Sequence, residues 1–278
     1  MEHQEGFFTG PRDKQVYYQS WLPEGEPKAV MLVIHGLAEH CGRYMNVVDY
    51  FIPRGYAVYG FDQIGHGNSE GTRVYVERFE EYITTTKTFI DMVQTWQSGK
   101  PVFILGHSMG SLIGAVYLLD HQDGLSGAII SGTMVKVPDH VTATTVTMGK
   151  VLSRLLPKAG VVGIEAEHIC SDSAVVDAYV NDPLVYTGKT TARLAAEMLK
   201  AMQSFPSKAS QITLPMIIVQ GGEDKLVNVE DCQLLYDMVS STDKTVKVYD
   251  GFEHEVFNEP GREIVFQDIH AWLEAHLN

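Results

Sequence analysis

The sequence has few of the features that mark secreted, membrane-spanning or nucleic-acid-binding proteins. Its three cysteines, Cys41, Cys170 and Cys232, have neither the pair spacing of a metal site nor an even count for disulfides, so we expect reduced thiols. The N-terminus has no basic region followed by an apolar stretch, and no apolar run is long enough to cross a bilayer. These absences predict a cytoplasmic protein, for which contact with a membrane surface stays possible.

Positive charge is also scarce. The chain has 21 Lys and Arg against 35 Asp and Glu, for a formal charge of −14, and the acidic residues are spread along it. A polyphosphate partner would be repelled, so we expect no nucleic acid ligand. The glycine-rich segment Asp62–Ser69 lacks paired ligands at metal spacing, and we interpret it as a structural turn. We therefore expect neither a metal nor a cofactor.

The order of apolar runs predicts one α/β domain with an insertion. Short apolar runs alternate with helical patterns, which is typical of βα units around a mostly parallel sheet. The eight expected strands, of which the first two read as an antiparallel hairpin, are Phe7–Thr9, Gln15–Trp21, Ala29–His35, Ala57–Phe61, Val102–Leu105, Ala128–Ser131, Met216–Gln220 and Thr245–Tyr249. The helices that we expect around this sheet are Arg43–Phe51, Phe79–Gln97, Ser108–Asp120, Val229–Ser240 and Ile264–His276.

Residues 133–212 break this alternation. They carry helical patterns but no core strand, and we expect a loop at Gly160–Ile164. We interpret them as a cap, or lid, inserted after the sixth strand into a core domain of residues 1–132 and 213–278. Ligands bind at the carboxyl ends of strands in open α/β sheets, and long insertions are usually functional, so we expect this cap above the site.

The segment Gly106-His107-Ser108-Met109-Gly110 predicts a nucleophile elbow. It follows the apolar run that ends at Leu105 and opens a helical run. A serine on a sharp strand-to-helix turn has strained backbone angles, and glycines on both sides leave room for that turn. The helix N-terminus also favours negative charge that develops next to Ser108.

The partners of a catalytic serine follow in order along the chain. His254 lies in the loop after the last expected strand, and Asp224 lies just beyond the strand before it, with Glu223 as its neighbouring competitor. The order Ser108, Asp224, His254 is that of the α/β-hydrolase architecture. We predict these three as the triad, and we predict the backbone N–H groups of Leu37 and Met109 as the oxyanion hole.

With these residues in place, the chain from about residue 29 to residue 277 resembles the α/β-hydrolase superfamily, and within it the monoacylglycerol lipase and lysophospholipase-like group of bacterial type. The segments that carry the resemblance are His35–Tyr44, Asp62–Gly71, Gly106–Gly110 and Gly251–Glu259. The resemblance implies that Glu39 and Arg43 bind the glycerol part of the substrate, and that Tyr179 lines the polar end of the pocket. The chain departs from mammalian members in having Phe257 and Ala38 where they have His and Gly.

The sequence thus predicts a serine hydrolase that releases fatty acid and glycerol from a monoacylglycerol. A short-chain carboxylesterase, a lysophospholipase, an amide or peptide hydrolase and a ligand receptor on the same scaffold remain as alternatives. Epoxide hydrolases and dehalogenases need a carboxylate where this elbow has Ser108. The apolar residues that we expect to line an acyl channel, and to contact a membrane or micelle surface, are Val141, Met148, Leu152, Leu155, Leu156 and Ile164.

Overall fold

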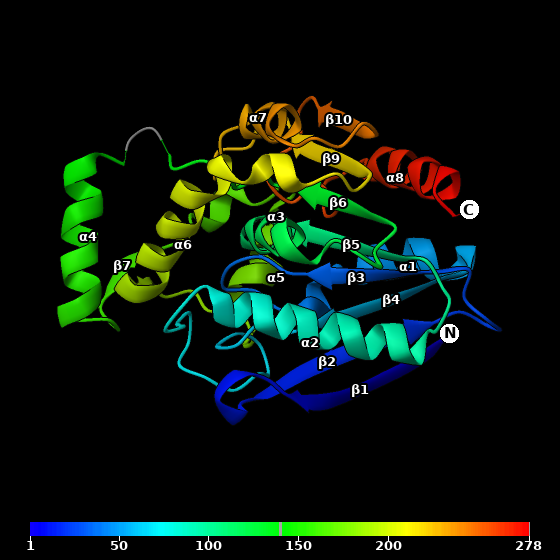
Figure 1. Cartoon of the computed structure of the whole chain (residues 1–278), viewed down its shortest axis with the longest axis horizontal. Helices are drawn as coiled ribbons and strands as arrows, with labels where there is room; N and C mark the ends of the chain where they lie inside the picture. Colours follow the sequence, from blue (N-terminus) through cyan, green and yellow to red (C-terminus); the bar gives the residue numbers. More distant parts are fainter. Residues whose placement is uncertain (139–140, 278) are drawn as a thin grey trace.

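Eight strands form one sheet in a computed structural model that describes residues 1–138 and 141–277. The spatial order is β1-β2-β4-β3-β5-β6-β9-β10 (Figure 1). The strands are β1 (Glu2–Thr9), β2 (Gln15–Leu22), β3 (Ala29–Ile34), β4 (Tyr56–Phe61), β5 (Val102–His107), β6 (Gly127–Ser131), β9 (Met216–Gly221) and β10 (Lys244–Tyr249). All eight expected strands are present, so the predicted α/β-hydrolase architecture of the sheet is confirmed.

The sheet is parallel except at its first edge. β1 and β2 form the expected antiparallel hairpin, and β2 runs antiparallel to β4. Every residue of β3, β4, β5, β6 and β9 is buried, because helices cover both faces, and this explains why these strands read as continuous apolar runs.

Two hydrophobic cores lie on opposite faces of the sheet. One face packs against α1 (Met45–Phe51) and α8 (Glu263–Ala275), through residues such as Phe51 and Phe266. The other face packs against α2 (Glu80–Trp96), α3 (Met109–His121) and α7 (Asp231–Met238), through residues such as Phe89 and Leu112. Short 3₁₀ turns occur at Pro11–Asp13, Cys41–Tyr44, Ile52–Arg54, Ala166–His168, Phe205–Ser207 and Ala209–Gln211. The helix expected from Arg43 therefore begins as such a turn.

Residues 133–212, which we call the cap segment, hold three α-helices and a small separate sheet in their described parts, 133–138 and 141–212. Thr142 and Thr191 cap two of these helices, by accepting the backbone N–H of Thr145 and of Leu194 respectively. The elements are α4 (Ala143–Leu155), β7 (Gly160–Val162), α5 (Ser173–Asn181), β8 (Thr190–Thr191) and α6 (Ala192–Ser204). The expectation of a loop at Gly160–Ile164 was wrong: part of it pairs with β8. Strands of three and two residues are too short to show an alternating pattern.

The cap segment lies at the carboxyl ends of the central strands. In Figure 1 the arrows of β3, β5 and β6 point toward α4 and α6. α6 packs through Leu194, Met198 and Met202 on the core that contains Phe89 and Leu112, whereas α4 packs against α6. Among the helices of residues 1–138 and 141–277, none combines the length and the apolar character needed to cross a membrane.

Candidate active site

Ser108 occupies the sharp turn that the elbow pattern predicts. The residue has a φ of 54° and a ψ of −120°, and it lies between the end of β5 and the first residue of α3. The flanking glycines are required by sterics: a Cβ on Gly110 would lie 1.9 Å from the Ile34 carbonyl oxygen, and one on Gly106 would lie 2.5 Å from the Gly110 oxygen. The backbone strain at Ser108 is therefore held by close packing of α3 against β3 and β5.

His254 and Asp224 form a buried pair. The His254 Nδ1 atom lies 2.7 Å from the Asp224 Oδ2 atom. The Asp224 Oδ1 atom accepts the N–H groups of Leu226 and Val227, and Gln220 Nε2 donates to Oδ2 at 2.7 Å. With four polar contacts on its two oxygens, the carboxylate is fixed in a position that orients the imidazole.

Opposing effects set the protonation of this pair. Burial favours the neutral forms of both groups, but their mutual charge and hydrogen bond outweigh it. As a result the pKa of Asp224 lies below its ordinary value, and the pKa of His254 lies above its ordinary value, with further support from Glu255 and Glu39. Asp224 is thus charged at neutral pH and stabilises the imidazolium form of His254.

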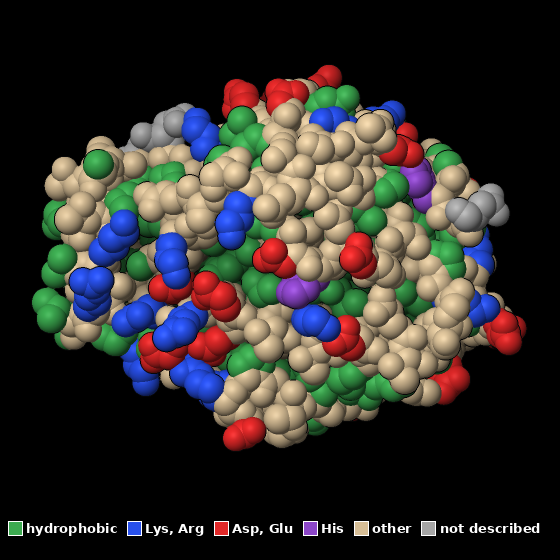
Figure 2. Space-filling model, viewed as in Figure 1, with side chains coloured by type: hydrophobic (Ala, Val, Ile, Leu, Met, Phe, Trp, Pro, Cys, Tyr) green, Lys and Arg blue, Asp and Glu red, His purple; other side chains and the backbone are tan. Residues whose placement is uncertain are grey.

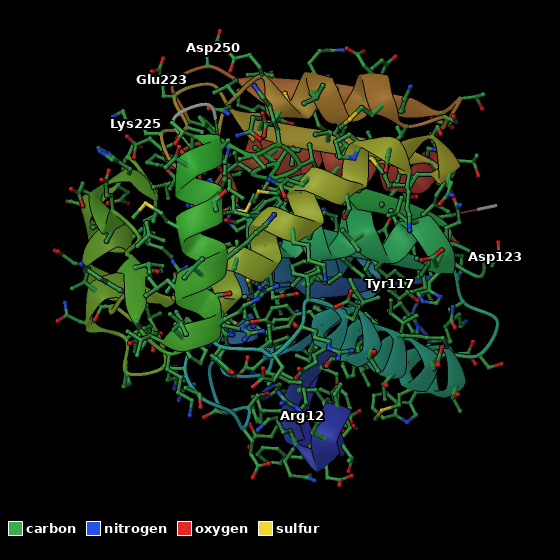
Figure 3. All side chains as sticks on the ribbon, turned by 60° about the vertical axis from the view of Figure 1, so that its left-hand side comes forward. Arg12, Tyr117, Asp123, Glu223, Lys225 and Asp250 are labelled. Carbon is green, nitrogen blue, oxygen red and sulfur yellow. The ribbon has the colours of Figure 1, made fainter. Side chains whose placement is uncertain are left out.

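The structure distinguishes Asp224 from Glu223 as the partner of His254. Glu223 is exposed, whereas Asp224 is buried beside His254. Figure 3 shows Glu223 and Lys225, the two neighbours of Asp224, at the outer edge of the molecule. Our sequence analysis missed Gln220. A polar residue near the end of the buried apolar strand β9 was the available signal for it.

Ser108 and His254 line one cavity of about 1050 Å³. Gly132, with a φ of 57°, lets the chain pass close to the imidazole, since a Cβ there would lie 2.8 Å from His254 Cε1. The His107 ring lies 4.7 Å from the His254 ring, centroid to centroid, and burial lowers the pKa of His107 to about 3. Because Asp224 occupies Nδ1 of His254, Nε2 is the ring nitrogen left for Ser108.

The two expected oxyanion amides flank Ser108. Met109 directly follows it, and Leu37 lines the same cavity in the loop after β3. Gly36 lies close enough that a Cβ on it would be 3.2 Å from the Ser108 Cβ. The hydrogen bonds found among the described residues involve neither the Leu37 N–H nor the Met109 N–H. Both donors are thus available for an oxyanion.

The cavity is apolar over most of its length. All six residues that the sequence analysis expected in an acyl channel line it: Val141, Met148, Leu152, Leu155, Leu156 and Ile164. Leu155 and Met148 are also 73% and 67% exposed at the cavity rim. Figure 2 shows hydrophobic side chains over α4 at the left edge of the molecule, beside a group of Lys and Arg side chains.

Of the three residues expected to bind the alcohol part of a substrate, the structure places two in the lining of the cavity. Glu39 and Tyr179 line the cavity, whereas Arg43 is absent from its lining. Arg43 instead binds Glu39 and Glu255 and lies over the Tyr179 ring, with its guanidinium carbon 4.6 Å from the ring centroid. Sequence reasoning gave Glu255 no role, although it follows His254 directly and lines the cavity.

The glycine-rich turn after β4 is organised by hydrogen bonds within the protein. The two carboxylate oxygens of Asp62 accept the N–H groups of Cys41 and Asn68, and the Ser69 hydroxyl donates to the Asp62 carbonyl. These contacts fit the structural interpretation of Asp62–Ser69. Cys41, Cys170 and Cys232 are free thiols and are buried.

Comparisons with known proteins agree with this geometry. The family described as "Serine aminopeptidase, S33" (Hydrolase_4) matches residues 25–261. The chain is 36% identical to the monoacylglycerol lipase of Mycolicibacterium smegmatis, over 98% of each chain, and 30% identical to the human monoglyceride lipase, over 93% of this chain and 86% of that one. The crystal structure of the Paleococcus ferrophilus monoacylglycerol lipase superposes with a TM-score of 0.82 at 26% identity, over 99% of this chain and all of that one.

The elbow, the buried His–Asp pair and the apolar cavity are the equipment that an acyl-transfer enzyme needs. The family match covers most of the chain, and the relatives match nearly all of it. The chain therefore belongs to the Hydrolase_4 family of α/β-hydrolases, and it is an ester hydrolase of the acylglycerol lipase type.

Proposed function

We propose that the protein hydrolyses monoacylglycerols to a free fatty acid and glycerol, with Ser108, His254 and Asp224 as its catalytic triad. The observation that carries this proposal is the single cavity that joins Ser108 and His254 to a long apolar lining. A fatty acyl chain needs such a lining, and a volume of about 1050 Å³ exceeds what a short-chain ester requires.

The first half of the reaction is acyl transfer to Ser108. His254 Nε2 takes the hydroxyl proton as the Ser108 oxygen attacks the ester carbonyl, while Asp224 stabilises the imidazolium. The Leu37 and Met109 N–H groups bind the oxyanion of the tetrahedral intermediate. His254 then gives its proton to the glycerol oxygen, which leaves. A water molecule, deprotonated by His254, releases the fatty acid in the second half.

Glu39 and Tyr179 are our candidates for contact with the glycerol hydroxyls. Both line the cavity and both contact Arg43, which also binds Glu255, so polar side chains gather at this part of the lining. A carboxylate accepts hydrogen bonds from hydroxyl groups, and the Tyr179 hydroxyl supplies a donor. This arrangement favours an alcohol with free hydroxyls over a second acyl chain.

We also propose that residues 133–212 act as a lid on a core of residues 1–132 and 213–278, and that α4 contacts lipid surfaces. Met148, Val151 and Leu155 expose apolar surface on this helix. Residues 141–163 include Lys150, Arg154 and Lys158 but no acidic residue, in a chain whose formal charge is −14. Apolar surface next to positive charge is suited to a membrane or micelle interface.

The test compares initial rates of fatty acid release from 1-lauroylglycerol, dilauroylglycerol and 4-nitrophenyl butyrate. We expect turnover of the monoacylglycerol, little of the diacylglycerol, and a loss of about 10⁴-fold or more in Ser108→Ala. The exposed Ser207, changed to alanine, is the matched control. Activity confined to the butyrate ester would favour a short-chain carboxylesterase.

An amide hydrolase is the second candidate, because the matching family is described as a serine aminopeptidase. The same triad cleaves amides when the leaving amine is protonated by the histidine. Aminoacyl arylamides, included in the same assay, separate the two candidates. Faster cleavage of these amides than of 1-lauroylglycerol would replace the lipase proposal, and stoichiometric ligand binding without turnover of any substrate would favour a receptor.

A further inference from the structure

Arg43 lies at the centre of a buried ionic network. Its Nη1 and Nη2 atoms donate to the two carboxylate oxygens of Glu255 at 2.6 and 2.8 Å, which is a bidentate contact. Nη1 also donates to Glu39 Oε2 at 2.8 Å. The Arg43 side chain is only 10% exposed. Planar guanidinium groups are suited to such forked contacts, which fix both partners in direction as well as distance.

Each carboxylate in this network holds one loop of the proposed active site. Glu39 Oε1 accepts the Gly36 N–H at 2.6 Å and the Tyr44 hydroxyl at 2.9 Å, and Gly36 is the residue before Leu37. Glu255 is the residue after His254. Its Oε2 atom also accepts a hydrogen bond from the Asn258 amide group at 2.8 Å, a contact within the His254 loop.

Arg43 therefore connects two loops that are far apart in the sequence. One loop carries the proposed oxyanion amide of Leu37, and the other carries the proposed base His254. The path runs from Gly36 through Glu39, Arg43 and Glu255 without leaving hydrogen-bond distance. The absence of Arg43 from the cavity lining fits this position and leaves the substrate's alcohol to other side chains.

We propose that Arg43 and Glu255 are positioning residues that fix the Leu37 loop and the His254 loop relative to each other, and that Arg43 does not bind the alcohol. This inference rests on the proposed triad, but not on the identity of the alcohol. It assigns Arg43 a different role from the glycerol contact that the sequence resemblance implied.

The network also sets the charge around His254. The groups that face the His254 ring are Asp224, Glu255, Glu39 and His107. Two carboxylates and one guanidinium give the network a formal charge of −1. The negative groups help to keep the pKa of His254 above its ordinary value, although burial acts against them. Removing the charge of Glu255 therefore lowers the pKa of His254.

Two esters with the same acyl chain separate positioning from alcohol binding. Methyl laurate has no free hydroxyl on its alcohol, whereas 1-lauroylglycerol has two. We expect Arg43→Met to lower kcat by about 100-fold on both esters, with little change in the ratio of their KM values, because a small displacement of the reacting groups has an effect of this size. A loss confined to 1-lauroylglycerol and expressed in KM would overturn the proposal.

Conservative variants separate geometry from charge. Arg43→Lys keeps the charge but cannot make the bidentate contact, so we expect a lower kcat with an unchanged acid limb of the pH–rate profile. Glu255→Gln should move that limb to lower pH. Wild-type kcat in Arg43→Lys, or an unmoved limb in Glu255→Gln, would each contradict the corresponding half of the proposal. Arg54→Met is the matched control, because Arg54 is exposed and stacks on Tyr50.

The rate of Ser108 labelling by a fluorophosphonate distinguishes this proposal from the proposed function. The probe needs the serine, its base and the oxyanion hole, but no glycerol. Labelled wild type that fails to hydrolyse monoacylglycerol would refute the substrate alone, and slower labelling of Arg43→Lys would still support the positioning role. Wild type that is not labelled would refute the proposed machinery, and labelling of Arg43→Lys at the wild-type rate would refute the positioning role.

Discussion

The two halves of the cap segment are attached to the rest of the molecule in different ways. The half from η4 (Ala166–His168) to β8 contacts the active-site loops through polar groups: the Ile169 carbonyl accepts the Glu255 N–H at 2.7 Å, and the Tyr186 N–H donates to the Ala38 carbonyl at 2.8 Å. By contrast, α4 packs against α6 and exposes its apolar side chains.

We infer from this difference that the cap segment performs two tasks. The inner half, residues 166–191, is hydrogen-bonded to the loops of Leu37 and His254 and would hold them in place. It also has a small core of its own, formed by Ile169, Cys170, Tyr179 and Val185, against which Leu226 of the Asp224 loop packs. The outer half, α4, forms the rim of the cavity and meets the solvent. Changes in the inner half that disturb these contacts should affect every substrate, and changes at exposed positions of α4 should affect mainly substrates with long acyl chains at a lipid surface.

The largest effect that we expect is from Asp224→Asn, in the loop that packs on the inner half. The amide cannot stabilise the imidazolium and favours the wrong tautomer of His254, so kcat should fall by about 10⁴-fold. The drop should be the same for dispersed and for vesicle-bound substrate. Glu223→Gln is the control, and a drop of similar size there would reassign the acid.

The pH dependence of wild type follows from the same pair. The proposed base His254 can accept a proton only when neutral, and its pKa is raised above the usual 6.5, so kcat/KM should rise with pH to a plateau, with a midpoint above 6.5. The stability that the charged His254 contributes is present below 6.5 and is lost as the pH rises through the folded-state pKa. A midpoint below 6.5 in a pH–rate profile would contradict this assignment.

Glu259→Ala removes a contact between the inner half and the His254 loop. The Glu259 carboxylate is 1% exposed and accepts the N–H groups of Ser171 and Glu253 at 2.8 and 3.0 Å, as well as the Ser171 hydroxyl. We expect a loss of about 3 kcal/mol in the free energy of unfolding, because buried donors lose their acceptor. Urea denaturation measures it, and the exposed Glu167, changed to alanine, should stay within about 0.5 kcal/mol of wild type.

Leu155→Asp tests the outer half. We expect about a 10-fold lower rate on 1-oleoylglycerol in anionic phospholipid vesicles, since one exposed leucine loses its apolar contact with the surface. The rate on dispersed 4-nitrophenyl butyrate should not change. Ile264→Asp, an equally apolar and 52% exposed position on α8, outside the cap segment, is the matched control. Equal losses on both substrates would assign Leu155 to the catalytic unit.

Ala38→Gly should have the smallest effect. Ala38 has a φ of 66°, in the left-handed region that favours glycine, and the Tyr186 N–H binds its carbonyl there. Relief of this strain, less the greater entropy of glycine in the unfolded chain, predicts about 0.5 kcal/mol of added stability. Thermal unfolding measures the shift, and a destabilised variant would show that the Ala38 side chain contributes more by packing than it costs by strain.

The sequence predicts the sheet and the triad candidates better than it predicts the connections between them. Apolar runs such as Val102–Leu105 are local patterns, so the strands and the elbow can be predicted from the sequence. The order of the strands then brings Asp224 and His254 to one edge of the sheet. The Arg43–Glu255 contact joins positions 212 apart in the chain. Ala38, with its φ of 66°, likewise contacts a residue far along the chain, Tyr186 of the cap segment. Neither feature has a local pattern.

The pairing of β6 with β9 has a consequence for biosynthesis. These neighbours, matched at Ala128 and Met216, are separated in the chain by the whole cap segment. Closing so long a loop is slow, and domains fold as the ribosome extends them from the N-terminus. The nascent chain therefore contains Ser108 well before Asp224 and His254 emerge. We expect the growing polypeptide to remain inactive until β9 and β10 have paired with the rest of the sheet.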